Sequence, residues 1–199
     1  MATGDPLRVG ILVFDGVEEL DVAGPYEVLA TWAEVSALRP SVVTFSPDGL
    51  GVRCAKGLRL VPDHGIDDVG PLHVLVHPGG DGTRALAADE AHLAWLRTVR
   101  TTTPLIASVC TGARVLAAAG LLAGRPATTY WDAFDDLARI EPSALLDTEA
   151  RFVDDGDVVT AAGVSAGIDM ALHLVDRLES TAVARTVRRA IQYDPAPPV

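Results

Sequence analysis

One cysteine lies where a strand-like run meets a helix-like run, and a thiol in that position could act as a nucleophile. Residues 106–113 read Ile-Ala-Ser-Val-Cys-Thr-Gly-Ala, so an apolar strand would run directly into a helix with Cys110 at the turn. Small residues follow the cysteine, as in a nucleophile elbow in which cysteine replaces serine. The N-terminus of the helix is expected to favour the thiolate and to lower the thiol pKa. The N–H of Thr111 is then placed to hold a developing anion.

Both cysteines also have a purely structural interpretation. A free cysteine commonly packs as a small buried hydrophobe, and the pattern alone leaves this alternative open for Cys110. Cys54 stands in a predicted hairpin without an elbow, so the structural role is favoured there. Two cysteines in such different settings do not indicate a disulfide framework.

A glycine-rich turn follows another predicted strand. Residues 78–82 read Pro-Gly-Gly-Asp-Gly after the apolar run 73–77. Adjacent glycines let the backbone approach a ligand closely, so the N–H groups of Gly79 and Gly80 could form the second half of an oxyanion hole. The same residues could equally form a flexible turn. The segment lacks the GxGxxG and GxxxxGK(S/T) patterns, so it does not predict a dinucleotide or nucleotide phosphate site.

A carboxylate in an apolar setting is the third candidate. Residues 18–25 read Glu-Glu-Leu-Asp-Val-Ala-Gly-Pro, and Asp21 lies among apolar neighbours. Partial desolvation there would raise the pKa of Asp21 toward the range that is useful for general acid–base catalysis. Asp21 could instead cap the helix that begins nearby, and Glu18 and Glu19 are alternatives for the acid–base role.

The five histidines do not indicate a metal site, because none has HExxH-like or CxxC-like spacing. His77 ends a strand and could reach the floor of a pocket, although a packed structural role is favoured. His92 and His173 fall within predicted helices and are expected to be structural or surface residues. No metal site is therefore predicted.

Short β-rich runs alternate with helical stretches along the chain and supply the scaffold for these residues. Several strands are continuously apolar, as expected for strands that are buried on both faces of a parallel sheet covered by helices. Ligands bind outside the carboxyl ends of such strands, where all three candidate segments lie. We therefore predict an α/β fold: a doubly wound, mostly parallel, flavodoxin-like sheet sandwiched by helices, formed by residues 1–199 as a single domain.

The predicted elements have the following bounds. Strands are predicted for residues 8–14, 41–45, 73–77 and 105–109, and hairpins for residues 52–61 and 151–161. Helices are predicted for residues 18–35, 89–100, 111–119, 167–178 and 181–191. Pro25 is assigned to the first turn of its helix, where a missing N–H costs nothing, and Asp89 is assigned as a helix cap.

The composition excludes several classes of protein. The chain has 199 residues, is 49% apolar and carries a formal net charge of −11. The apolar fraction is too high for intrinsic disorder, and the acidic balance argues against general nucleic-acid binding. No uninterrupted apolar stretch reaches the length of about 18 residues that would span a membrane. Residues 1–5 are polar and do not indicate a signal peptide, so a cytoplasmic location is expected.

With these residues in view, the chain resembles the ThiJ/PfpI superfamily, relatives of the class I glutamine amidotransferases. The resemblance covers most of the chain and makes a functional role for Cys110 more strongly favoured. It is carried by Leu-Asp-Val-Ala-Gly-Pro at 20–25, Pro-Gly-Gly at 78–80, Cys-Thr-Gly-Ala at 110–113, Ala-Gly-Leu-Leu-Ala-Gly at 119–124, Ala-Thr-Thr-Tyr-Trp at 127–131, Ala-Gly-Val-Ser-Ala-Gly-Ile-Asp at 162–169 and Tyr-Asp-Pro at 193–195.

Within the superfamily the chain looks most like the isonitrile hydratase-like branch. That branch pairs a Cys-Thr elbow with the aspartate of an LD-x-x-GP segment, which is Asp21 here. Protease-like members carry histidine where this chain has Thr111, so peptidase activity is not expected. Deglycase-like and glyoxalase-like members usually place a glutamate near the cysteine, where Asp21 stands here. Tyr130 departs from the histidine that the superfamily often has, and tyrosine is a poor base near neutral pH.

The resemblance implies a cysteine-dependent, carbon–nitrogen-directed hydro-lyase that needs no metal and no organic cofactor. Cys110 would attack the isonitrile carbon of a small-molecule substrate and form a thioimidate, with Asp21 as general acid–base. Gly79, Gly80 and Thr111 would hold the polar intermediate. Hydrolysis would then release an N-substituted formamide.

The resemblance also bears on the pocket walls and on partners. Tyr130 and Trp131 would wall the pocket and accept an apolar substituent, although Trp131 could equally be a core residue. Superfamily members are commonly dimers, so a homodimer is implied, with neither nucleic acid nor membrane as partner. The chain stops soon after Tyr193 without a recognition helix, so a stand-alone protein is expected.

Two alternative functions stay open at this point. One is glyoxalase-like or deglycase-like activity on small reactive carbonyls. The other is a non-catalytic ligand or redox sensor, related to the sensor halves of AraC-type regulators, which share this style of sequence.

Overall fold

A seven-stranded sheet forms the centre of the protein, and it is parallel except at one edge. The computed structural model describes residues 6–194, and its main sheet has the strand order β10-β11-β7-β6-β1-β2-β5. Within this sheet, β10 and β11 pair antiparallel, and the other described neighbours pair parallel. Strands β6, β7 and β11 are buried along their whole length, which confirms the predicted α/β fold. The strands are β1 (Arg8–Leu12), β2 (Ser41–Ser46), β5 (His64–Gly65), β6 (Val74–His77), β7 (Leu105–Val109), β10 (Phe152–Asp154) and β11 (Val158–Ala161).

Two smaller sheets have two strands each. Strand β3 (Val52–Arg53) pairs antiparallel with β4 (Arg59–Leu60), and β8 (Pro126–Ala127) pairs parallel with β9 (Leu145–Leu146). The β3–β4 and β10–β11 pairs confirm the two predicted hairpins. The β8–β9 pair is absent from the sequence prediction, because strands of two residues carry no readable alternation of apolar and polar side chains.

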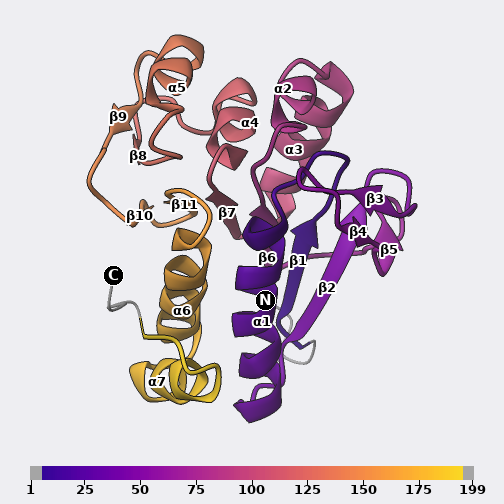
Figure 1. The fold of residues 1–199 in the computed structure, drawn as a ribbon, viewed down its shortest axis with the longest axis vertical. Helices are drawn as coiled ribbons and strands as arrows, with labels where there is room; N and C mark the ends of the chain where they lie inside the picture. Colours follow the sequence, from indigo (N-terminus) through magenta and orange to yellow (C-terminus); the bar gives the residue numbers. More distant parts are fainter. Residues whose placement is uncertain (1–5, 195–199) are drawn as a thin grey trace.

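The helices pack in two groups. Helix α1 (Glu19–Val35) contacts α6 (Ala166–Leu178) and α7 (Thr181–Ala190), and Figure 1 shows α1 and α6 side by side. Helix α4 (Gly112–Ala118) contacts the other three, α2 (Thr83–Leu86), α3 (Glu90–Thr102) and α5 (Phe134–Ile140). Helices α1 and α4 follow β1 and β7 directly in the chain, so both begin near the carboxyl end of the sheet.

Two predictions about helix starts have different outcomes. Asp89 caps α3 as predicted, since its side chain accepts hydrogen bonds from two N–H groups at the start of that helix. Pro25 lies in the second turn of α1, because the helix begins at Glu19, so its assignment to the first turn is wrong. The missing N–H of Pro25 leaves the main-chain carbonyl of Asp21 without its usual helical partner.

The two chain ends lie outside the described residues. They comprise residues 1–5, for which the sequence predicts no signal peptide, and residues 195–199, which include the whole proline-rich segment 195–198. Within residues 6–194, no helix is both long enough and apolar enough to cross a membrane.

Strands β1, β6 and β7 are neighbours, so the segments that follow them meet at one edge of the sheet. A close approach occurs at Gly112, the first residue of α4. A Cβ on Gly112 would lie 2.2 Å from the carbonyl oxygen of His77. Glycine is therefore required for the turn after β7 to pack against the turn after β6.

We expect Gly112→Ala to destabilise the protein, even though alanine is the better helix former by about 1 kcal/mol. Relief of the contact with the His77 carbonyl needs a backbone shift, which we expect to cost about 2 kcal/mol and to lower Tm by about 4–8 °C. Thermal unfolding followed by circular dichroism measures this. In the control variant Gly51→Ala the new Cβ meets the Leu60 carbonyl at 3.3 Å. An unchanged or raised Tm for Gly112→Ala would contradict the close approach.

Candidate active site

Cys110 occupies a strained turn between β7 and α4. Its φ of 57° lies in the left-handed region, which residues other than glycine rarely adopt. Its N–H donates to the carbonyl groups of Ala161 and Ala162, at 3.1 and 3.0 Å. These bonds tie the turn to the end of the neighbouring strand β11 and maintain the strained conformation. The geometry confirms the nucleophile elbow predicted from residues 106–113.

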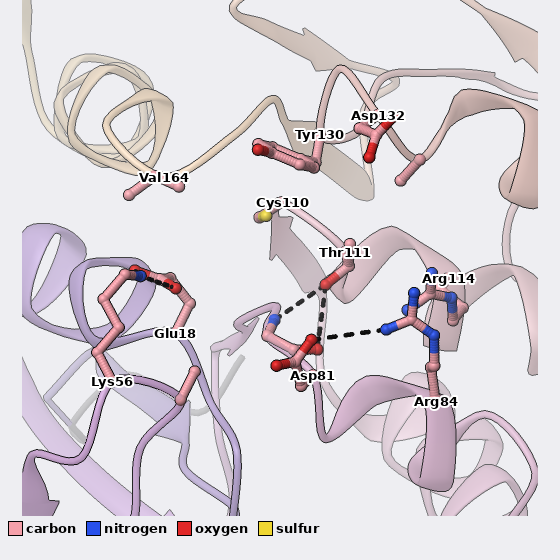
Figure 2. A pocket seen from close by; sticks show the side chains of 13 residues that line it. Glu18, Lys56, Asp81, Arg84, Cys110, Thr111, Arg114, Tyr130, Asp132 and Val164 are labelled. Carbon is pink, nitrogen blue, oxygen red and sulfur yellow. Dashed lines mark hydrogen bonds and ion pairs between the residues drawn. The ribbon is translucent and has the colours of Figure 1, made fainter.

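The Cys110 side chain points into a cavity of about 320 Å³ at this edge of the sheet (Figure 2). Thr111, Gly80 and Tyr130 also line this cavity. Trp131, which the sequence places in the pocket wall, does not line the cavity and is 73% exposed. The two aromatic rings still contact each other, with their centroids 5.5 Å apart, so Trp131 packs on the outer side of Tyr130.

Asp21 lies near the start of α1 and is fully buried. Its Oδ2 accepts a hydrogen bond from the Gly79 N–H at 2.9 Å, whereas its Oδ1 has no hydrogen-bond partner among the described residues. Burial raises the pKa of Asp21 to about 7, although the Gly79 N–H acts to lower it. The carboxyl group accepts its hydrogen bond from outside α1, so the structure does not support the helix-cap alternative.

The two neighbouring glutamates have other partners. The Glu18 carboxylate forms an ion pair with Lys56, the only lysine in the sequence, and raises the pKa of that lysine. Glu19 accepts hydrogen bonds from the N–H groups of Lys56 and Leu58. Burial acts to raise the pKa of Glu19, but backbone hydrogen bonds lower it overall. Asp21 is therefore the acid–base candidate among the three carboxyl groups.

The Cys110 thiol is not the low-pKa group that the sequence predicts. Burial and the nearby Asp21 carboxylate raise its pKa to about 12. Helix α4 has only seven residues, and its dipole is too small to offset both effects. At neutral pH the site therefore holds a protonated thiol beside a carboxyl group that is about half ionised.

Three groups near the sulfur of Cys110 nevertheless act to lower the thiol pKa, namely the N–H groups of Thr111 and Val164 and the Thr111 hydroxyl. Val164 has a φ of 47°, which is unusual for a β-branched residue and is maintained by the surrounding loop. The sequence pattern assigns no role to Val164, although it lies in the segment 162–169 that carries part of the family resemblance.

The N–H groups of the glycine turn are already used inside the protein. The Gly79 N–H donates to Asp21, and the Gly80 N–H donates to Oγ1 of Thr111 at 2.9 Å. This corrects the expectation that Gly80 offers a free donor to an intermediate, since the donors near the sulfur belong to Thr111 and Val164. Gly79 and Gly80 instead position two side chains of the site.

His77 lies beneath the glycine turn and does not line the cavity. It is fully buried, and burial lowers its pKa to about 3. Its Nδ1 lies 3.0 Å from the carbonyl oxygen of Pro78, and its Nε2 lies 3.2 Å from Nε2 of His92. The histidine pair therefore supports the start of the turn, in agreement with the packed role predicted for His77.

Two arginines, to which the sequence pattern assigns no role, line the same cavity. Arg114 follows Cys110 by four residues, and this helical spacing is the signal that could have placed both on one side of the elbow. Arg84 lies in α2, just after the glycine turn. No local pattern distinguishes Arg84 from an ordinary surface arginine.

The chain has relatives along almost its whole length. A model of the DJ-1/PfpI family matches residues 7–177. The isonitrile hydratase of Pseudomonas putida is 38% identical over 192 residues, which cover 96% of this chain and 81% of that protein. A crystal structure of a ThiJ/PfpI family protein from Pseudomonas syringae superposes with a TM-score of 0.88 at 34% identity, over 98% of this chain and 78% of that one. The HTH-type transcriptional regulator GbdR of Pseudomonas aeruginosa is 27% identical over 96% of this chain and 52% of the regulator.

We expect Asp21→Asn to lower the pKa of the Cys110 thiol, because the variant removes the carboxylate charge that raises it. The pH dependence of alkylation by iodoacetamide, in a Cys54→Ala background, measures this pKa. Asp132→Asn is the matched control, since Asp132 lines the cavity but is not among the groups that shift the thiol pKa. A thiol pKa that is unchanged or higher in Asp21→Asn would refute the coupling of the two groups.

The burial of Asp21 also predicts a pH-dependent loss of stability. Its pKa is 3.8 in the unfolded chain and about 7 in the folded protein, so the folded protein holds more protons between these values. The free energy of unfolding therefore falls as the pH rises from about 4 to 7, by at most about 4 kcal/mol from this group. In urea unfolding, Asp21→Asn is expected to lose less stability than the wild type between about pH 5 and 8. Parallel losses in the two proteins would argue against the raised pKa.

Proposed function

The chain belongs to the DJ-1/PfpI family, and we propose that it is an isonitrile hydratase, which adds water to an isonitrile to give an N-substituted formamide. The observation that carries this proposal is a buried carboxyl group with a pKa of about 7 beside a thiol that opens into a cavity. Hydration of an isonitrile needs a nucleophile for the terminal carbon and a group that delivers a proton to that carbon. Cys110 and Asp21 would supply both.

In the first step, the Asp21 carboxylate takes the thiol proton of Cys110 while the sulfur attacks the isonitrile carbon. A C–S bond forms, one carbon–nitrogen π bond breaks, and the carbon is left with a lone pair. That carbon then takes the proton from Asp21, which gives a thioimidate. A pKa of about 7 suits both transfers, because the carboxylate is a stronger base than usual and the acid form still donates at neutral pH.

In the second step, water attacks the thioimidate carbon, and Asp21 accepts one of its protons. Asp21 passes that proton to the nitrogen, which gives an adduct that carries a hydroxyl group. The carbonyl then forms as the C–S bond breaks with its electron pair moving to sulfur, and the hydroxyl proton passes through Asp21 to the sulfur, which restores the thiol of Cys110. Oδ1 of Asp21, which is buried and has no hydrogen-bond partner among the described residues, is the atom available for these transfers. One isonitrile and one water molecule thus give one formamide, with no further reactant.

The donors around the sulfur support both steps. The N–H groups of Thr111 and Val164 stabilise the negative charge that develops as the thiol loses its proton. The Thr111 hydroxyl accepts a hydrogen bond from the Gly80 N–H at 2.9 Å and lies 3.3 Å from the Gly80 carbonyl oxygen, to which it donates, so the glycine turn fixes the position of this hydroxyl. Tyr130 lines the cavity, and its hydroxyl can donate or accept a hydrogen bond there. Neither step uses Tyr130 as a base.

Similarity to the Pseudomonas putida enzyme supports this function along nearly the whole chain. One observation favours a second candidate, a ligand sensor, because the regulator GbdR is similar over an equally long part of the chain. The two candidate functions differ in whether the protein converts its ligand into a product. A sensor needs the cavity but does not need the proton transfers between Asp21 and Cys110.

We expect the purified protein to convert cyclohexyl isocyanide into N-cyclohexylformamide, measured by liquid chromatography. Cys110→Ala is expected to abolish turnover, and Asp21→Asn to lower kcat by about 10²–10⁴-fold, because it removes the general acid–base. Cys54→Ala is the control, since Cys54 lies in the β3–β4 hairpin and does not line the cavity.

Turnover that survives in Cys110→Ala would rule out the covalent mechanism. Lactate production from methylglyoxal, without formamide production, would point to glyoxalase chemistry instead. Oxidation of Cys110 without turnover of either substrate would favour the sensor.

A further inference from the structure

Charged side chains are unevenly distributed around the Cys110 cavity. Three cations line it, Lys56, Arg84 and Arg114, in a chain that has 16 Lys and Arg residues against 27 Asp and Glu. Lys56 forms its ion pair with Glu18 on one side of the cysteine, and both arginines lie on the opposite side (Figure 2). The arginine side is therefore the place to look for recognition of an anion.

Arg114 is a buried cation whose donors are not all used. Its side chain is 7% exposed, and its Nε and Nη2 atoms contact Oδ2 of Asp136 at 2.6 and 2.5 Å. Its Nη1 donates to Oγ1 of Thr83 at 2.8 Å. A guanidinium group has five N–H donors, so both Nη atoms keep an N–H group that these contacts do not use. Arg114 lines the cavity and can offer these donors to a ligand.

Arg84 adds a second guanidinium on the same side. Its ion pair with Asp81 spans 3.5 Å, which is too long for a strong hydrogen bond. Burial acts to raise the pKa of Asp136, but Arg114, Arg139 and Arg84 lower it overall. Three guanidinium groups thus share one carboxylate, and Asp81 alone does not neutralise the remaining positive charge.

The exposed acids around the cavity oppose this charge only weakly. The Asp81 side chain is 86% exposed, and Asp132 is an exposed residue beside Tyr130 (Figure 2). Water and salt screen charges at such positions far more than they screen the buried guanidinium of Arg114. A ligand bound deep in the cavity therefore experiences mainly the guanidinium of Arg114, whereas Arg84, whose side chain is 70% exposed, is screened much as Asp81 is.

We propose that the substrate is an isonitrile that carries a carboxylate on a short chain, which Arg84 and Arg114 bind while Cys110 attacks the isonitrile carbon. This inference rests on the proposed function and names its substrate class. Planar guanidinium groups match the two oxygens of a carboxylate. The Thr83 hydroxyl contacts both Arg114 and Thr111, the residue after Cys110, so the guanidinium lies a short distance from the cysteine. A linker of about one to three methylene groups would therefore connect a carboxylate at Arg114 to an isonitrile group at Cys110.

A purely apolar substituent suits this side of the cavity less well. It would cover the unused N–H groups of Arg114, which would then lose their hydrogen bonds to water without gaining another acceptor. This loss carries a desolvation cost. Trp131, expected from the sequence to supply an apolar wall, lies outside the cavity. The apolar lining near the cysteine consists of the Tyr130 ring and the small side chains of Val164 and Ala133, and Tyr130 and Val164 lie away from the arginines (Figure 2).

Matched acids and esters test the proposal. Isocyanoacetate, 3-isocyanopropanoate and 4-isocyanobutanoate are each compared with their methyl esters, which keep the chain and remove the charge. For the preferred acid we expect kcat/KM to exceed that of its ester by about tenfold or more at low ionic strength. Raising the salt concentration from about 0.05 to 0.5 M is expected to reduce this ratio.

Arg84→Gln tests the arginines directly, because Arg84 is largely exposed and its loss leaves the pair of Arg114 and Asp136 in place. We expect the acid-to-ester ratio of kcat/KM to fall by about fivefold or more, mainly through a higher KM for the acid. Arg139→Gln is the matched control, since Arg139 also pairs with Asp136, at 3.0 Å, but does not line the cavity. The ratio is expected to stay as in the wild type.

The possible failures are distinguishable. Equal kcat/KM for acids and esters, or equal losses for both in Arg84→Gln, would overturn the carboxylate proposal and leave isonitrile hydration in place. If neither the six compounds nor cyclohexyl isocyanide were hydrated, the proposed function itself would be overturned.

Discussion

The burial of the Asp21 carboxyl beside the Cys110 thiol is the interaction on which the rest of the site depends. Neither group can ionise freely without water, and a negative charge on one opposes a charge on the other, so both pKa values rise. The pair therefore titrates as a unit and can pass one proton between its members as the sulfur changes its bonding. The donors near the sulfur and the glycine turn beside the carboxyl group fix the position of the thiol relative to the carboxyl group.

The sheet holds the pair together, because β1, β6 and β7 are adjacent and each ends in one part of the site. Close packing of the following turns requires glycine at several positions, and two of them lie where the turn after β6 meets the turn after β7. A Cβ on Gly79 would lie 2.5 Å from the Thr111 nitrogen, and a Cβ on Gly112 would lie 2.2 Å from the His77 carbonyl oxygen. Groups held by packed backbone in this way need little reorganisation during a reaction.

The features that the sequence predicts correctly are those that depend on neighbouring residues. The elbow at Cys110, the cap at Asp89 and the buried strands all follow from local patterns. The thiol pKa depends on Asp21, which is distant in sequence, and the Gly80 N–H donates to Thr111, which is also distant in sequence. No local pattern contains such contacts. The exposure of Trp131 and the arginine side of the cavity likewise depend on how distant turns meet, so only the folded chain reveals them.

The single lysine of the chain has a chemical consequence. Lys56 stands at the cavity opposite the arginines, and its ion pair with Glu18 keeps the amine protonated and hence unreactive toward electrophiles. Every other cationic side chain is an arginine, and the second cysteine, Cys54, is buried. If the protein acts on isonitriles, as we propose, it thus presents few lysine and cysteine nucleophiles that could compete with Cys110 for an electrophile. The scarcity of lysine and cysteine would therefore limit covalent inactivation of the protein by its substrate during repeated turnover.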